Sequence, residues 1–307
     1  MHKHDNNMSG QSNFRLGIDL GGTKTEVVVL DDKLQTVFRK RVATPAQDYE
    51  AILVMITDLV SEASNSLGRW PTVGIGTPGA LSPGTGMLRN SNTGCLNGKP
   101  LQADIERRLD CSVILQNDAN CFTLSEALMG AGQNFMTVFG VILGTGTGGG
   151  LVVDRQLLTG PNAIAGEWGH NPLPWPNESD GSPRCYCGKT GCIETYISGS
   201  GLASNFQHKT GLVLSSEAIV RAAEQGDNNC EQAMDLYYDQ LARSLAHVIN
   251  IIDPDVIVLG GGMSNIDEIY RQLPGRLLSY VFSDILATTI LPAQHGDASG
   301  VFGAAML

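Results

Sequence analysis

Residues 17–31 read GIDLGGTKTEVVVLD and residues 140–154 read GVILGTGTGGGLVVD, and the two stretches align without a gap. In each, an apolar run leads into a turn of glycine and threonine, and a second apolar run follows, which is the pattern of a β-hairpin. Two copies are too few for a repeat array. The pair therefore predicts two related domains, each opening with a glycine-rich hairpin.

The composition of these turns favours phosphate binding. Backbone N–H groups without side-chain cover can cradle phosphate oxygens, and threonine hydroxyls add donors. Neither turn is a Walker loop, which opens a helix with Gly-Lys-Ser/Thr, or a dinucleotide fingerprint, which joins a strand to a helix. A plain tight turn explains one hairpin equally well, so the inference depends on the matched pair. Asp19, in the first hairpin, is either a residue that holds the water shell of a metal ion or a buried turn residue.

The rest of the chain alternates strands and helices. Apolar spacing predicts strands at 72–76, 112–116 and 255–259, and helices at 48–66, 101–109, 119–131, 215–225 and 231–252. This alternation indicates an α/β protein, and 307 residues suit two domains. A third glycine cluster, 260–262, ends the strand at 255–259, after which Ser264 or Asn265 is placed to cap a helix.

Three cysteines crowd into eight residues, and a histidine stands fifteen positions before the first of them. These residues are His170, Cys185, Cys187 and Cys192. Three thiolates and an imidazole suit a tetrahedral zinc site, and four protein ligands make it structural rather than catalytic. Glycines at 188 and 191 allow the chain to turn tightly between the sulfurs. A disulfide is the weaker interpretation, because disulfides are rare in reducing compartments.

Charge and hydropathy exclude several classes of function. The net charge of -11 argues against a nucleic-acid partner and against an anionic membrane surface. No apolar run approaches the length of a membrane-spanning helix. Residues 1–14 are polar and lack the apolar core of a secretory signal, so we expect a disordered tail and a cytoplasmic protein.

Asp118 is the candidate catalytic carboxylate. It follows the strand at 112–116, and open α/β sheets bind ligands in the crevice at the carboxyl ends of their strands. Asn117 or Asp118 can also cap the next helix, and one of them can cap while the other contacts a ligand. Phosphoryl transfer to a hydroxyl needs phosphate-binding loops, a divalent ion and a carboxylate that takes the hydroxyl proton. The chain offers the loops and Asp118.

Several polar side chains can pair with sugar hydroxyls. The candidates are Asn92, Asn117, Glu167, His170 and Glu194. Two of them have an alternative role, since Glu167 can support a zinc ligand and Glu194 can be the N-terminal carboxylate of a helix.

Taken together, these motifs resemble the ROK family of sugar kinases, from about residue 15 to the C-terminus. The residues that carry the resemblance are Gly17–Lys24, Gly74–Gly79, Asn117–Asn120, Leu143–Gly150, Gly166–His170, Cys185–Glu194 and Asp253–Gly262. The resemblance implies a two-domain actin-like ATPase (ribonuclease H-like) α/β fold with a structural zinc knuckle. The expected domains are 15–118 with about 291–307, and 119–290 with the zinc site.

The same resemblance implies roles for the candidate residues. Asp118 is the general base, and Asn92, Asn117, Glu167, His170 and Glu194 bind the sugar, with Gly79 beside it. His170 then serves both zinc and sugar. ATP and Mg²⁺ are implied by the reaction. The residues expected at the phosphates of ATP are Asp19, Gly21, Gly22, Thr23, Lys24, Gly144, Thr145, Gly146 and Thr147, and those near the adenosine are Gly260, Gly261 and Gly262.

The most specific prediction concerns which sugar is preferred. The stretches Gly169–Trp175, Leu96–Gly98 and Ser244–Asn250 look most like bacterial fructokinases with activity on mannose, which predicts ATP-dependent conversion of fructose to fructose 6-phosphate, with mannose or glucose as further substrates. N-acetylglucosamine kinases are the alternative. Cys95 stands where some relatives have tryptophan, which leaves the choice of hexose open.

The family also contains sugar-responsive transcription repressors, and its kinases are usually dimers or tetramers. A repressor needs a helix-turn-helix unit, and about sixteen polar residues precede the first hairpin. We therefore expect a kinase that forms a homodimer or a higher homo-oligomer.

Overall fold

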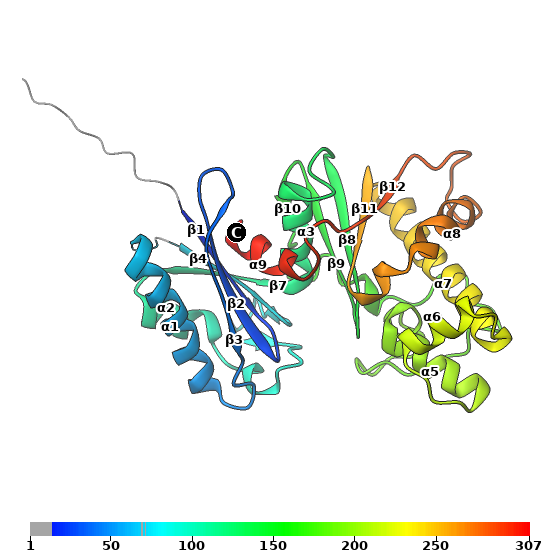
Figure 1. Cartoon of the computed structure of the whole chain (residues 1–307), viewed down its shortest axis with the longest axis horizontal. Coiled ribbons are helices and arrows are strands. Elements are labelled where there is room, and N and C mark those ends of the chain that lie inside the picture. The colour runs from blue at the N-terminus through cyan, green and yellow to red at the C-terminus, as the bar shows by residue number, and fades with distance from the viewer. Residues whose placement is uncertain (1–13, 69, 71) are drawn as a thin grey trace, which may run out of the picture. The chain divides into compact units, whose positions relative to one another are not determined.

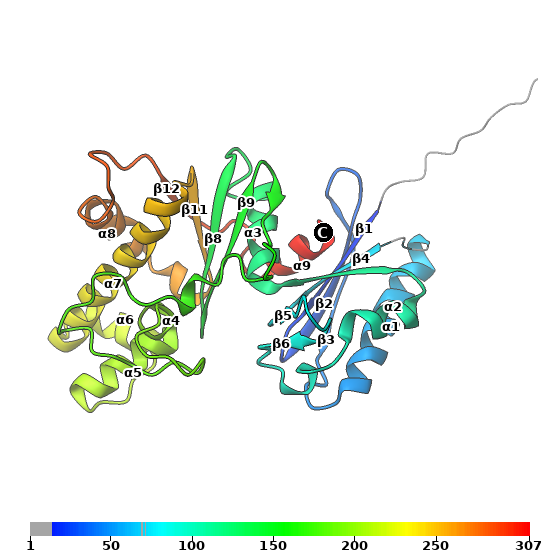
Figure 2. The same cartoon turned by 180° about the vertical axis from the view of Figure 1, so that it is seen from behind.

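The computed structural model describes residues 14–68, 70 and 72–307. They form two compact units, each with a central sheet and its own helices (Figures 1 and 2). The first unit holds the described residues up to Leu81, with Gly86–Gln116 and Ala304–Leu307, and the second holds Ser82–Thr85 and Asn117–Gly303. Whether these units fold as the domains expected at 15–118 with about 291–307 and at 119–290 stays a proposal. The expected tail at 1–14 lies, except for Phe14, outside the described residues.

The first unit has a five-stranded sheet in the order β3-β2-β1-β4-β7. The strands are β1 (Arg15–Leu20), β2 (Lys24–Leu30), β3 (Thr36–Ala43), β4 (Thr72–Thr77) and β7 (Ser112–Asn117). β1 and β2 form the first predicted hairpin, and β4 runs parallel to β1. Two short strands, β5 (Ala80–Leu81) and β6 (Leu88–Arg89), pair separately, and η1 (Gly94–Leu96) follows them.

Two helices, α1 (Tyr49–Leu67) and α2 (Leu101–Leu109), complete the core of this unit. Their apolar faces, including Ile56 and Ile105, pack with Ile18, Val27 and Val73 of the sheet. α1 begins where the Asp48 side chain accepts a hydrogen bond from the N–H of Ala51, an ordinary N-cap.

The second unit repeats the arrangement of hairpin and parallel strand. Its sheet has the order β10-β9-β8-β11-β12. The strands are β8 (Thr137–Leu143), β9 (Thr147–Val153), β10 (Gln156–Leu157), β11 (Val256–Gly260) and β12 (Thr289–Pro292). β8 and β9 are antiparallel and form the second predicted hairpin, whereas β11 is parallel to both β8 and β12. Both predicted hairpins are therefore confirmed.

The helices of the second unit surround a core built on α7 and the inner strands. They are α3 (Asp118–Met129), α4 (Glu194–Ile197), α5 (Gly199–Thr210), α6 (Ser216–Glu224), α7 (Asn228–Ile252) and α8 (Asp267–Leu277), with the 3-10 turns η2 (Trp168–His170), η3 (Gly262–Asn265) and η4 (Gly296–Ala298). α9 (Ser299–Ala305) ends the chain's helices. Leu241 and Leu245 of α7 lie fully buried against Val141 and Ile257 of the sheet.

One predicted cap is wrong. Ser264 and Asn265 do not begin the helix after β11, because both lie within η3. α8 instead starts after Ile266, which provides no side-chain cap. The Ser264 hydroxyl donates to the Gly261 carbonyl at 2.7 Å. The hydroxyl is therefore hydrogen-bonded within the glycine turn and does not cap the helix.

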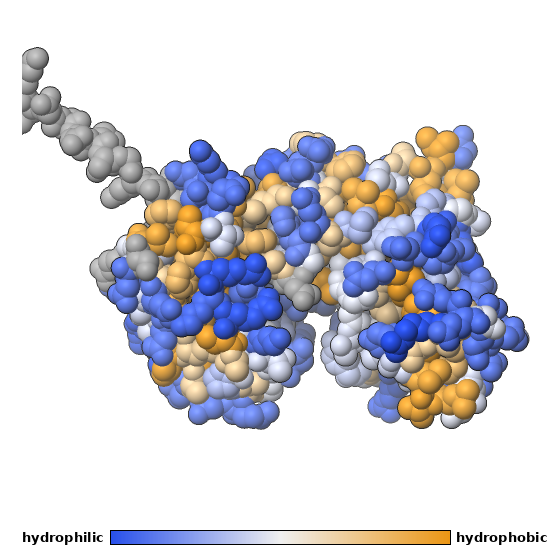
Figure 3. Space-filling model, in the orientation of Figure 1, coloured by the Kyte–Doolittle hydropathy of each residue, from blue (hydrophilic) through white to orange (hydrophobic). Residues whose placement is uncertain are grey.

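The face seen in Figure 3 is mostly polar, with apolar residues gathered in a few places. In the second unit, Phe282 and Ile285 are exposed in the loop after α8, and Leu212 and Val213 are exposed between α5 and α6. None of the helices in the described part of the chain combines the length and apolarity needed to cross a bilayer.

Candidate active site

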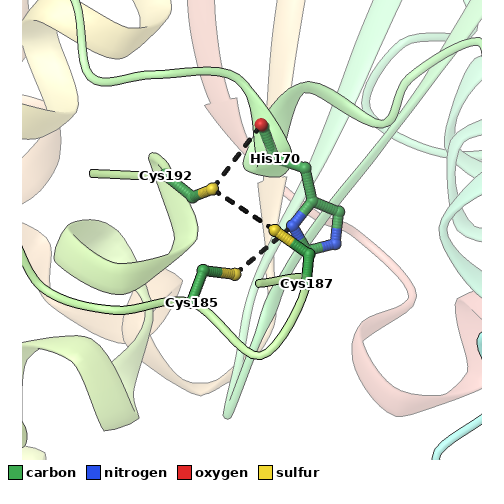
Figure 4. A group of neighbouring side chains, drawn as sticks. All are labelled: His170, Cys185, Cys187 and Cys192. Atoms are coloured by element: carbon green, nitrogen blue, oxygen red, sulfur yellow. Dashed lines mark hydrogen bonds between the residues drawn. The ribbon is translucent and has the colours of Figure 1, made fainter. Parts of the chain in front are cut away.

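The four predicted metal ligands meet in the second unit (Figure 4). One donor atom from each of His170, Cys185, Cys187 and Cys192 lies within 4.8 Å of all the others. Cys185 Sγ is 3.6 Å from His170 Nδ1, and Cys187 Sγ is 3.6 Å from Cys192 Sγ. In a tetrahedral site with Zn–S bonds of about 2.3 Å, neighbouring donor atoms are about 3.5–3.8 Å apart. The cluster therefore fits a zinc ion in both donor type and spacing.

Backbone hydrogen bonds shape residues 185–192, the cysteine loop. The N–H of Cys185 donates to Lys189 O at 2.8 Å, and Gly188 and Gly191 adopt positive φ angles of 89° and 72°. Burial, and the sulfurs of Cys187 and Cys185 beside it, raise the pKa of Cys192 to about 12. A bound cation supplies the positive charge that crowded thiolates require.

His170 uses its two ring nitrogens differently. Nδ1 faces Cys185 Sγ, and Nε2 lies 3.0 Å from the hydroxyl of Tyr186. The two rings meet edge to face at 5.2 Å. This arrangement makes Nδ1 the metal-facing atom and leaves Nε2 to Tyr186, which is 77% exposed. Tyr186 is a site residue beyond those predicted from the sequence, although its position between Cys185 and Cys187 was the available signal.

Asp118 opens α3 at the carboxyl end of β7. Asn117 is the N-cap and accepts from the N–H of Ala119 at 2.8 Å, and Asp118 Oδ1 accepts from the same N–H at 2.8 Å. Burial raises the pKa of Asp118, and the negative charge of Glu167 raises it further, against the lowering effect of the Ala119 N–H. A carboxyl group with a raised pKa beside a second carboxylate suits a general base.

Glu167 is brought near Asp118 by a close backbone contact. Gly166 has a φ of 90°, and a Cβ atom there would lie 2.3 Å from the Gly149 carbonyl oxygen of β9. The following Trp168 donates from Nε1 to the Gly148 carbonyl at 3.2 Å. The absence of a side chain at Gly166 thus allows the turn before His170 to lie directly on β9.

Glu194 connects the cysteine loop to the second hairpin. It is the first residue of α4, and its Oε2 atom accepts from the N–H of Thr147 at 3.0 Å. The alternative role as a helix N-terminal residue and the contact with the glycine loop are therefore both realised. A Cβ atom on Gly146 would lie 2.8 Å from this carboxylate, so a side chain there would displace the Glu194 carboxylate.

The two glycine clusters of the second unit lie at the ends of neighbouring strands. Gly260 pairs with Ile142 in the sheet, and Gly261, with a φ of 82°, lies against the carbonyl of Leu143. The turn itself is held by a hydrogen bond from Gly199 N–H to Gly144 O at 2.8 Å. The structure therefore brings together residues 144–147 and 260–262, as a shared nucleotide site requires.

The remaining candidates belong to the first unit. Asp19 is half-buried in β1, opposite Glu26 of β2. Gly22 lies near Asn92, since a Cβ atom there would be 3.9 Å from Asn92 Oδ1. Gly79 has a φ of 87° and lies against the Arg89 carbonyl. The roles expected for these residues, and for Gly21, Thr23 and Lys24 in the first turn, stay predictions.

Comparison with known proteins settles the family. The sequence profile described as "ROK family" matches residues 15–307. The chain belongs to the ROK family. It is 44% identical over 300 residues to N-acetyl-D-glucosamine kinase of Pectobacterium atrosepticum, which covers 95% of this chain and 97% of the relative.

Solved structures confirm the fold class. A ROK hexokinase from Thermus thermophilus superposes with a TM-score of 0.86 and 28% identity over 95% of this chain and 97% of that chain. A ROK glucokinase from Streptomyces griseus, in complex with glucose and AMPPNP, has a TM-score of 0.73 and 29% identity over 95% of this chain and 98% of that chain. The fold is thus the predicted two-sheet, actin-like sugar kinase fold.

Proposed function

We propose that this ROK-family protein is an ATP-dependent sugar kinase whose preferred substrate is N-acetyl-D-glucosamine. The observation that carries the proposal is the 44% identity to an N-acetyl-D-glucosamine kinase over 95% of the chain. Further N-acetyl-D-glucosamine kinases, including one from Citrobacter koseri, are 42% identical over the same share. These relatives favour the alternative raised by the sequence over the expected fructose, mannose or glucose.

In this proposal Asp118 is the catalytic base. Its carboxylate removes the proton of a sugar hydroxyl as that oxygen attacks the terminal phosphorus of ATP, and ADP leaves with the electrons of the broken P–O bond. The raised pKa of Asp118 makes the carboxylate a better proton acceptor. Mg²⁺, when bound, neutralises the charge that develops on the phosphates.

The other candidates divide between substrate and nucleotide. Asn117, Glu167 and Glu194 bind the hydroxyl groups of the sugar, with Asn92 and Gly79 of the first unit as further contacts. His170 binds a sugar hydroxyl through Nε2, in place of the Tyr186 hydroxyl. The phosphates of ATP bind at the turns at 21–24 and 144–147, with Asp19 at the metal's water shell, and the adenosine lies near 260–262. Zinc, held by His170 and the three cysteines, keeps His170 and Glu194 in place.

A coupled assay for ADP release tests the substrate. Purified protein is given ATP and Mg²⁺ with N-acetylglucosamine, fructose, mannose or glucose, and kcat/KM is compared among the four sugars. The proposal predicts the highest kcat/KM with N-acetylglucosamine. A higher value for fructose would restore the other specificity, and no turnover with any of the four sugars would contradict the proposed hexose kinase. Asp118→Asn protein in the same panel controls for contaminating kinases.

A further inference from the structure

The second unit buries an ion pair far from Asp118 in the sequence. Arg243, in the middle of α7, is 1% exposed, and the side chain of Asp180 is fully buried. Arg243 Nη2 donates to Asp180 Oδ1 at 2.7 Å and Nη1 donates to Asp180 Oδ2 at 2.9 Å. Arginine and aspartate are almost never fully buried unless they are paired, so the burial of each side chain depends on the other.

The guanidinium group also holds the backbone of the loop before the cysteines. Arg243 Nη1 lies 2.9 Å from the Trp175 carbonyl and 3.3 Å from the Pro174 carbonyl. Asp180 in turn accepts from the N–H of Asn177 at 2.8 Å and from Gln240 Nε2 at 2.9 Å. Both ends of the stretch 174–180 are therefore bound to one face of α7.

A second set of contacts closes the same loop from outside. Arg243 Nε forms an ion pair with Asp239 Oδ2 at 2.9 Å, and Asp239 Oδ1 accepts from the Tyr280 hydroxyl at 2.7 Å. The Tyr280 ring stacks on Trp175 with ring centroids 5.5 Å apart and planes at 20°. We call Trp175, Asp180, Asp239, Arg243 and Tyr280 the loop clamp.

Packing alone does not explain the clamp. Apolar residues of similar volume often replace a buried ion pair without loss of stability. Only a fork of fixed N–H donors can satisfy a carboxylate and backbone carbonyls at once, and arginine has that geometry whereas lysine does not. The arrangement therefore determines the path of the loop, which apolar packing would leave less defined.

The clamped loop connects directly to the metal ligands and to Glu194. Residues 171–173 pair with 191–193, through Leu173 N–H to Gly191 O at 2.8 Å and Ile193 N–H to Asn171 O at 2.9 Å. Pro174, bound by Arg243, follows this pairing at once. At the other end of the loop, Asp180 lies five residues before Cys185, and the Gly181 carbonyl accepts from the Tyr196 hydroxyl of α4.

We propose that Arg243 is a positioning residue, which acts through Asp180 and the loop at 174–180 to hold the cysteine cluster and Glu194 in register with His170. Loss of the fork lets residues 171–174 shift, and the paired segment 191–193 shifts with them. The effect on zinc follows from the structure alone. The effect on sugar binding rests on the proposed function, in which Glu194 contacts the sugar.

The test compares Arg243→Lys and Asp180→Asn with the unaltered protein, each loaded with zinc. Release of zinc to a chromogenic chelator is followed at a temperature well below the melting temperature of every variant. Loss of residues that support metal ligands typically costs about 10–100-fold in metal affinity, and we expect release to accelerate by about that factor. The KM for N-acetylglucosamine should rise by about 10-fold.

Leu273→Ala is the control for stability. Leu273 is fully buried in α8, and its truncation should lower the melting temperature without changing zinc release. If Arg243→Lys and Asp180→Asn release zinc no faster than Leu273→Ala, or if the zinc-treated unaltered protein retains no zinc, the inference is overturned. If the unaltered protein phosphorylates no sugar while both clamp variants release zinc faster, the clamp stands and the proposed function fails.

Discussion

At the scale of single residues, the central feature is the pair of carboxylates Asp118 and Glu167. Burial and the charge of Glu167 raise the pKa of Asp118. Asn117 and Asp118 both accept from the Ala119 N–H, so the cap of α3 does not depend on Asp118 alone. A base needs this combination of a fixed position and a strengthened affinity for protons.

Asp118→Asn should abolish most turnover without unfolding the protein. The amide has almost the same shape and can still accept from the Ala119 N–H, but it cannot take a proton. Loss of a general base typically costs about 10²–10⁴-fold, so kcat should fall by about that factor. Steady-state kinetics measure kcat, and calorimetry should show that the variant still binds the sugar. A near-normal kcat would show that another group is the base.

Glu167→Gln should change the pH dependence of the reaction. A base acts when deprotonated, so kcat/KM falls as the pH drops through the pKa of Asp118, which lies above its ordinary 3.8. Removing the charge of Glu167 lowers that pKa, and the acidic limb of the profile should move to lower pH. Profiles of kcat/KM from about pH 4 to about pH 8 test this. An unmoved limb, or one displaced to higher pH, would contradict the assignment.

At the scale of elements, the cysteine loop joins three short segments that have little regular structure of their own. It contacts η2 through His170, continues into α4 through Glu194, and Glu194 binds the N–H of Thr147 at the start of β9. A bound metal ion would hold such segments together, because its ligands come from several of them.

Cys187→Ser should weaken zinc retention and raise the KM for the sugar. Cys187 is the exposed ligand, so its replacement removes a metal bond with little loss of packing. We expect the KM for the sugar to rise by about 10-fold, as for other losses near metal ligands. Elemental analysis after dialysis measures the zinc. The control is Cys111→Ser, which changes a half-buried thiol outside the cluster. This variant should keep the zinc content and the KM of the unaltered protein. A Cys187→Ser protein with full zinc content and an unchanged KM would show that Cys187 is not a ligand.

At the scale of the whole molecule, the two units have separate hydrophobic cores. One cluster of buried residues joins β8, β11 and α7, and the other joins β1, β2, β4 and α1. The metal cluster belongs to the second unit alone. The expected homo-oligomer stays a prediction. Two apolar side chains of the second unit, Phe282 and Ile285, are exposed.

Removal of zinc should therefore loosen one unit and leave the other intact. Structural zinc contributes its binding free energy to folding, and local opening is reported by hydrogen exchange. With a chelator present, amides in residues 171–193 and α4 should exchange faster, whereas amides in β1, β2 and β4 should not change. Equal acceleration in both units, or none in either, would contradict this view. A chelator saturated with zinc beforehand is the control.

Local patterns in the sequence were enough for much of the fold. The helix at 101–109 was predicted to the residue. The two hairpins and the strands near 72–76 and 112–116 were also predicted, because apolar spacing and turn residues fix the backbone through neighbours that are close in the sequence. The helix expected at 231–252 begins three residues earlier, at Asn228, because Asp227 caps it.

The sequence by itself also predicted the cluster of His170 and three cysteines that the structure brings together, because thiols and imidazole at such short spacing have few other uses. It also carried the resemblance to the ROK family, which the profile match confirms. Only the tertiary structure decided which partners distant residues find. Arg243 reaches Asp180 across sixty-three positions, Glu194 reaches Thr147 across forty-seven, and Ser264 bonds within its own turn instead of capping a helix. Spacing along the chain cannot specify such contacts, because they arise only when separate elements pack and bury their polar groups together.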